Sequence, residues 1–148
     1  MKTKIFVVSI IIALIVAFLP AAGVFAAPVH DGTPVAPMDD KGLESEWELK
    51  LHTLKYENLF FSRVRVLPSD FKDKDDLARA YELLHKYEAA LKQANAISLK
   101  HTGFDTKGRV LDVEDADKSV KDLAAYLHIM RAVRGMIAEE GLKIRTVK

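Results

Sequence analysis

The sequence predicts an all-α protein, an antiparallel three-helix bundle that follows a signal peptide and a proline-rich leader. Three observations predict this fold class. Apolar residues recur at helical spacing in three long segments of the chain. All five prolines lie at or before Pro68, so no proline interrupts a helix after that position. Acidic residues gather where the segments begin, as the helix dipole favours.

The composition is that of one globular domain large enough to bury a core. The 148 residues are 49% hydrophobic and 29% charged, with a formal net charge of +1 and no cysteine. This balance argues against a strongly basic nucleic-acid-binding protein, a disordered chain and a multi-span membrane protein. Because the chain has no cysteine, it has no disulfides, no thiol catalysis and no thiolate metal site.

Residues 1–26 have the form of a secretory signal peptide. Two lysines precede an uncharged apolar run, and small residues after Pro20 suit cleavage behind Ala26. The alternative is an uncleaved anchor, because the uncharged stretch Ile5–Val29 is long enough to span a bilayer. Cleavage is favoured, since Pro20 and Gly23 interrupt that stretch. We therefore expect a secreted or extracytoplasmic protein, which meets a membrane only if the segment stays uncleaved.

A leader and a first helix follow the signal peptide. Residues 27–42 contain three prolines and two glycines, which predicts an extended, flexible leader. Residues 43–67 predict a helix, because Trp47, Leu51, Leu54 and Phe61 recur at helical spacing. Trp47, Leu49 and Leu51 also alternate as in a strand, but the helical pattern extends further along the chain.

The second predicted helix begins behind a turn and reaches about Lys100. Either Asp73 or Asp75 can cap its start, since a short carboxylate accepts the free N–H groups of a first turn. Residues 101–103 end this helix, and Gly103 is placed to adopt the left-handed C-cap conformation.

The third predicted helix starts near Asp112 or Asp115 and stops at Gly141. The helical domain therefore spans residues 43–141. Each helix of about 25 residues would be roughly 37 Å long, which suits an antiparallel three-helix bundle. Residues 142–148 form a short basic tail that we expect to fray.

The connector between the second and third helices invites comparison with a calcium-binding loop. With Gly108 on the invariant glycine of such a loop, Asp105 takes the third position and Glu114 the final ligand position. However, Gly103 and Lys107 then occupy the first and fifth positions, where calcium needs oxygen ligands. A capped turn is the preferred interpretation, with the apolar residues 104 and 110 tucked into the core.

Histidines and carboxylates do not point to a metal or catalytic site. His85 and His101 would lie roughly 24 Å apart on one helix, so they cannot share a zinc ion. One histidine from each helix could meet only in a particular register: His52, His85 and His128. Paired carboxylates occupy polar or terminal positions, where nothing separates their pKa values: Asp39–Asp40, Asp75–Asp76 and Glu139–Glu140.

Motifs for phosphate, dinucleotide or nucleophilic chemistry are also absent from the sequence. We therefore expect no enzyme activity, no catalytic residue, no cofactor and no bound metal.

Two groups of side chains could bind a partner, although each has a simpler explanation. Aromatic residues of the first two helices could line a ligand groove, but at helical spacing they more often form the core: Trp47, Tyr56, Phe60, Phe61, Tyr81 and Tyr87. Basic residues near the C-terminus could touch an anionic lipid or polymer, but they also complement the helix dipole: Arg131, Arg134, Lys143, Arg145 and Lys148.

One segment carries a resemblance to known proteins. It reads His101-x-Gly103-Phe104-Asp105-x-x-Gly108-x-Val110-x-Asp112 and follows the alanine-rich helix segment 87–94. With these residues, the stretch 81–145 resembles a group of small secreted helical proteins of Chloroflexota-type bacteria, which are uncharacterised. The resemblance implies an exported all-helical fold and no functional residues.

The sequence therefore predicts an exported, non-enzymatic helical protein, either a cell-envelope interaction module or a structural subunit. Its partner would be a protein or envelope component of unknown identity and not a nucleic acid, and homo-oligomers are possible. The alternative is an extracytoplasmic helical chaperone or small-ligand carrier that uses the aromatic helix faces. A buried Trp47 would favour the interaction module, and an accessible one would favour the carrier.

Overall fold

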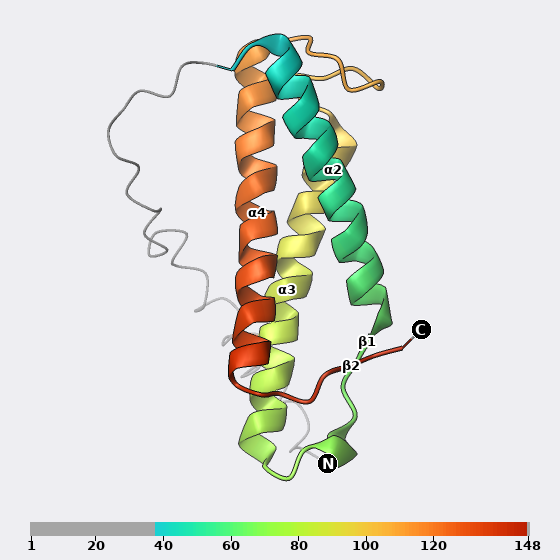
Figure 1. Cartoon of the computed structure of the whole chain (residues 1–148), viewed down its shortest axis with the longest axis vertical. Helices are drawn as coiled ribbons and strands as arrows, with labels where there is room; N and C mark the ends of the chain where they lie inside the picture. Colours follow the sequence, from blue (N-terminus) through green and yellow to red (C-terminus); the bar gives the residue numbers. More distant parts are fainter. Residues whose placement is uncertain (1–37, 148) are drawn as a thin grey trace, which may run out of the picture. The chain divides into compact units, whose positions relative to one another are not determined.

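The structure, a computed structural model, describes residues 38–147, which form three long helices (Figure 1). They are α2 (Asp40–Arg63), α3 (Lys74–Lys100) and α4 (Val113–Glu139). In Figure 1, α2 and α4 run in the same direction and α3 runs antiparallel to both. The predicted all-α three-helix fold is therefore confirmed. The predicted signal peptide and most of the predicted leader lie outside the described residues.

Each helix begins at an aspartate cap. The side chain of Asp39 accepts the N–H of Gly42, that of Asp73 accepts the N–H of Asp75, and that of Asp112 accepts the N–H of Asp115. The last two caps agree with the sequence. The first cap starts α2 at Asp40, so the last three residues of the predicted leader are helical.

The C-terminal end of α2 differs from the prediction. The helix ends at Arg63, four residues before the predicted Leu67, because Val64–Arg65 is extended and forms strand β1. β1 pairs antiparallel with β2 (Arg145–Thr146), with Val64 opposite Thr146. The short 3-10 helix η1 (Pro68–Asp70) then leads toward α3.

The C-terminal tail is ordered by this pairing, which corrects the prediction that it frays. Besides the strand pairing, the N–H of Val147 donates to the carbonyl of Arg63 across 2.9 Å. The guanidinium of Arg145 also pairs with the carboxylate of Asp70 from η1. The sequence did not reveal this partner, which lies 75 residues away along the chain.

A left-handed residue ends α3, but it is His101, with φ 49°, rather than the predicted Gly103. Gly103 also has a positive φ of 83°, and the absence of a side chain lets the connector backbone pass close to the backbone of α4. An alanine Cβ there would lie 2.1 Å from the backbone nitrogen of Ala116. Gly141 terminates α4 with φ 63°, as predicted.

The core lies between the three helices along most of their length. Its largest fully buried side chains come from all three helices: Trp47, Tyr87, Leu43, Leu83, Leu123 and Met130. One polar pair also joins α2 to α3, where the amides of Asn58 and Asn95 exchange hydrogen bonds of 2.9 and 3.0 Å. Within residues 38–147, none of the helices combines the length and hydrophobicity needed to cross a bilayer.

Candidate functional site

The connector 101–112 is a tight hydrogen-bonded turn. The carboxylate of Asp105 accepts the backbone N–H groups of Lys107 and Arg109 at 2.8 and 2.9 Å, and the Arg109 side chain at 2.7 Å. The backbone N–H of Arg109, with its side chain and the N–H of Lys107, lowers the pKa of Asp105. Phe104 and Val110 pair across the turn, and Phe104 is buried. This is the capped turn that the sequence favours over a calcium loop.

Trp47 fixes the connector to α2. Its indole stacks on the ring of Phe104, with 4.6 Å between centroids and an interplanar angle of 10°. The carboxylate of Glu44, one turn earlier on α2, accepts the backbone N–H of Val110 at 3.1 Å. Trp47 is only 1% exposed, so it is part of the core and does not line a groove.

The other aromatic residues divide into core and surface. Tyr87 is fully buried, and Phe60 and Phe61 pack beside it with centroid distances of 5.8 and 5.4 Å. Tyr56 and Tyr81 are exposed, so the prediction that all six aromatics form the core is wrong for these two. Tyr56 lies on a side of α2, and Tyr81 on a side of α3, that points away from the buried face of the helix.

A buried polar cluster joins all three helices. Glu57 of α2 is 6% exposed, and its carboxylate accepts a short hydrogen bond from the hydroxyl of Tyr87 on α3. Nη1 of Arg134 on α4 lies 3.2 and 3.3 Å from the two Glu57 oxygens. The Arg134 guanidinium also stands 4.6 Å from the centroid of the Phe60 ring, a cation–π contact. We call Glu57, Tyr87 and Arg134 the Glu57 cluster.

Burial, with the Glu57 hydrogen bond as the second cause, raises the pKa of Tyr87 above its ordinary value of 10.0. This shift predicts an alkaline weakening of the fold. As pH rises past about 10, the unfolded chain releases the Tyr87 proton while the folded chain retains it, so stability falls. The Tyr87→Phe variant lacks this component. Denaturant unfolding at increasing pH should show the wild type's advantage over Tyr87→Phe shrinking above pH 10; a constant advantage would contradict the prediction.

A small cavity lies beside the Glu57 cluster. It has a volume of about 210 Å³ and is walled by residues of all three helices and of the C-terminal segment: Phe60, Leu84, Arg134, Ile137, Ile144 and Thr146. Its lining is apolar apart from Arg134 and Thr146, so only a small, mostly apolar molecule would fit.

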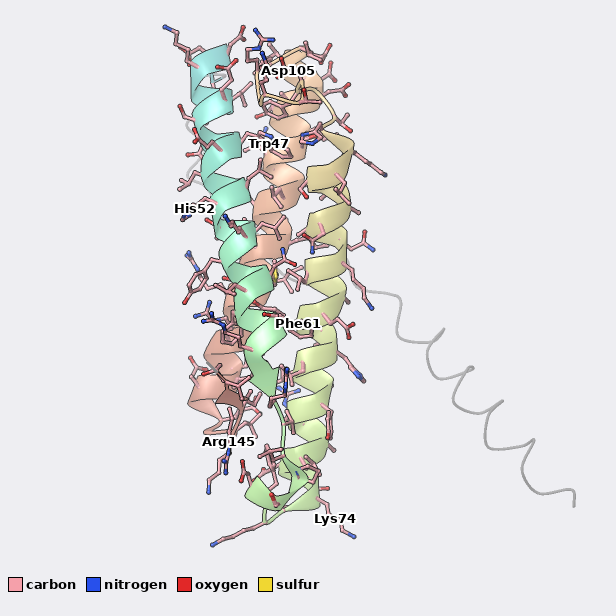
Figure 2. All side chains as sticks on the ribbon, turned by 90° about the vertical axis from the view of Figure 1, so that its right-hand side faces the viewer. Trp47, His52, Phe61, Lys74, Asp105 and Arg145 are labelled. Carbon is pink, nitrogen blue, oxygen red and sulfur yellow. The ribbon has the colours of Figure 1, made fainter. Side chains whose placement is uncertain are left out.

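The outer face of α2 carries three large apolar side chains that the core does not cover. Leu49 and Tyr56 are each 55% exposed, and Leu59 is 47% exposed. They fall on one side of the helix, together with the exposed His52. Figure 2 shows His52 on the side of α2 opposite to Trp47, which points into the bundle. We call these four residues the α2 stripe.

The predicted polar candidates are spread over the surface. His52, His85 and His128 are all exposed, each on a different helix. Among residues 38–147, no group of three or more histidine, aspartate or glutamate side chains is arranged to hold a metal ion. Glu140 pairs with Arg79 at 2.8 Å, which ties the end of α4 to α3.

Sequence reasoning missed the Glu57 cluster, although a signal was present. Glu57 follows Leu54 by three residues and precedes Phe61 by four, so it shares their helical face. A charged residue at such a core position predicts a buried partner. The α2 stripe was missed because the predicted helical pattern of residues 43–67 follows the buried face of the helix, and the stripe lies on the opposite face.

The chain matches no protein-family model, no curated protein and no solved structure.

Proposed function

We propose that the protein is an exported, non-enzymatic module of the cell envelope that binds a protein partner through the outer face of α2. The α2 stripe carries this proposal. Single exposed apolar residues are common on soluble proteins, but here Leu49, Tyr56 and Leu59 gather within three turns of one helix. Full burial of a fully exposed apolar side chain contributes about 1.5–3 kcal/mol, and these three are about half exposed, so a partner that covers all of them gains roughly 2–4 kcal/mol.

The roles of the polar side chains support a binding rather than a catalytic function. Glu57 holds buried structural bonds, Asp105 organises the connector, and Asp112 caps α4. Each carboxylate is thus engaged by donors of the fold itself. Residues 1–26 have the sequence pattern of a secretory signal peptide, which supports export of the protein.

A small-ligand carrier is the second candidate, and the cavity beside Arg134 is the observation in its favour. Its volume of about 210 Å³ falls below the usual ligand-pocket range of roughly 300–1,000 Å³. Arg134 is also already paired with Glu57, which weakens its attraction for an anionic ligand. The burial of Trp47 against Phe104 likewise supports the interaction module over a carrier or chaperone.

Photo-crosslinking tests the proposed surface with a matched control. A benzophenone amino acid replaces Tyr56 in one variant and Tyr81, an exposed tyrosine of α3, in the other. After irradiation in the envelope of the producing cell, we expect a discrete protein adduct from position 56 and none from position 81. Equal adducts from both positions, or none from position 56, would contradict a binding role for the outer face of α2.

A further inference from the structure

We infer that the partner of the α2 stripe is a second copy of this chain, with the two α2 helices packed antiparallel about a two-fold axis. This inference rests on the proposed function and names the partner. The residues of the α2 stripe are arranged symmetrically along the helix. Leu49 and Leu59 lie at equal distances on either side of position 54, and His52 and Tyr56 do the same closer in.

Antiparallel packing about position 54 brings complementary side chains together. Leu49 faces Leu59 of the second copy, and His52 faces Tyr56 of the second copy. Because the axis is two-fold, each contact occurs twice in the dimer. All four residues are exposed in the single chain, so the pairing covers the whole α2 stripe without disturbing the core.

Charge on the outer face of α2 favours this direction of packing. Exposed Lys41 and Glu48 lie in the N-terminal half of α2, and exposed Lys55 and Arg63 lie in its C-terminal half. In an antiparallel pair, Lys41 comes to the level of position 67 of the second copy, beyond the end of its α2. In an antiparallel pair, Arg63 comes to the level of the small Ser45 of the second copy, within one turn of its Glu48. A parallel pair would instead place Arg63 beside Arg63. The dipoles of two antiparallel helices also attract each other, whereas those of parallel helices repel, which favours the antiparallel arrangement too.

These charged groups are available for such contacts. No salt bridge engages Glu48, Lys55 or Arg63 within the part of the chain that the structure describes. By contrast, Glu46 on the neighbouring face of α2 already pairs with Lys50 at 3.0 Å. Glu48 and Arg63 therefore remain free to pair with each other between two copies.

The size of the surface predicts a weak, reversible dimer. Three half-exposed apolar side chains per copy cover less area than the roughly 1,200–2,000 Å² of a standard stable interface. Association is therefore expected to depend on concentration, as in a transient complex.

Analytical ultracentrifugation of the protein, purified as the cell exports it, tests the association. We expect the average mass to rise steadily from near that of the monomer toward that of the dimer as the concentration is raised about a hundredfold across the dissociation constant. Arg63→Glu should weaken the dimer about tenfold, since a rim ion pair of roughly 0.2–1 kcal/mol is lost twice. Combining Arg63→Glu with Glu48→Arg should restore it. A Leu99→Glu variant, which alters the most exposed large apolar side chain of another helix, should leave association unchanged.

Thiol crosslinking tests the direction of packing in a chain that has no cysteine of its own. A short bis-maleimide should join a Leu49→Cys chain to a Leu59→Cys chain in a mixture of the two. Leu49→Cys alone should remain largely uncrosslinked; efficient crosslinking of this variant to itself would indicate a parallel dimer and overturn the inference.

The outcomes separate this inference from the proposed function. A protein that stays monomeric at every concentration, while position 56 crosslinks to a different protein, overturns the second copy and leaves the proposed function standing. A monomer with no adduct at position 56 overturns both. A position 56 adduct of twice the chain mass, together with charge-swap restoration, supports both.

Discussion

The Gly103→Ala variant is expected to lose on the order of 4 kcal/mol of unfolding free energy, from left-handed strain and overpacking together. Gly103 has φ 83°, and an added Cβ would lie 2.1 Å from the Ala116 nitrogen and 2.5 Å from the Asp115 carbonyl carbon. These are backbone atoms of the first turns of α4, so no side-chain rotation relieves the clash. Thermal unfolding by circular dichroism should show a midpoint lower by on the order of 20 °C.

Two other glycines separate the clash from the backbone strain. Gly141 is also left-handed, with φ 63°, but a Cβ there would meet no atom within 4 Å. Gly141→Ala should therefore cost only the strain, about 1–2 kcal/mol. Gly135 lies inside α4 with equally open space, and Gly135→Ala should stabilise the helix by about 0.5–1 kcal/mol. If Gly103→Ala were no worse than Gly141→Ala, the close approach of the connector to α4 would be wrong.

The three helices could be predicted because their signals are local and repeated. Apolar periodicity extends over many turns, and the caps at Asp73 and Asp112 require only neighbouring N–H groups. The pairing of β1 with β2 left no such signal. Each strand has two residues, and its partner lies about eighty residues away, so nothing local distinguishes it from a helix end or a loose tail.

The candidate surfaces were harder to predict for a different reason. Leu49 and Tyr56 are apolar residues within a helix, and composition alone assigns them to a core. Their exposure follows from their angular position, about half a turn away from the centre of the buried face that holds Trp47 and Leu54. Glu57 shows the reverse case, in which a charged residue occupies the core face because Tyr87 and Arg134 supply donors from other helices.

The Glu57→Leu variant is expected to lose on the order of 3 kcal/mol of unfolding free energy. Removal of the carboxylate leaves the buried Tyr87 hydroxyl without its main acceptor and Arg134 without its counter-charge. Arg134 keeps a side-chain exposure of 36%, so water offsets part of its loss, and most of the cost falls on the fully buried Tyr87. Chemical denaturation at neutral pH measures the difference from the wild type.

Replacing all three residues of the Glu57 cluster shows why Glu57→Leu loses stability. The loss can come from the unpaired polar groups of Tyr87 and Arg134 or from poor packing of the new leucine. A triple variant with Glu57→Leu, Tyr87→Phe and Arg134→Met removes the three polar groups together, so none of them is left without its partner. Its stability should return to within about 1 kcal/mol of the wild type. Glu46→Leu is a control at a partly exposed position of the same helix, where the side chain is 37% exposed and pairs only with Lys50; it should change stability by no more than about 0.5 kcal/mol. If the triple variant were as unstable as Glu57→Leu, the loss would come from the packing of leucine at position 57 and not from stranded partners.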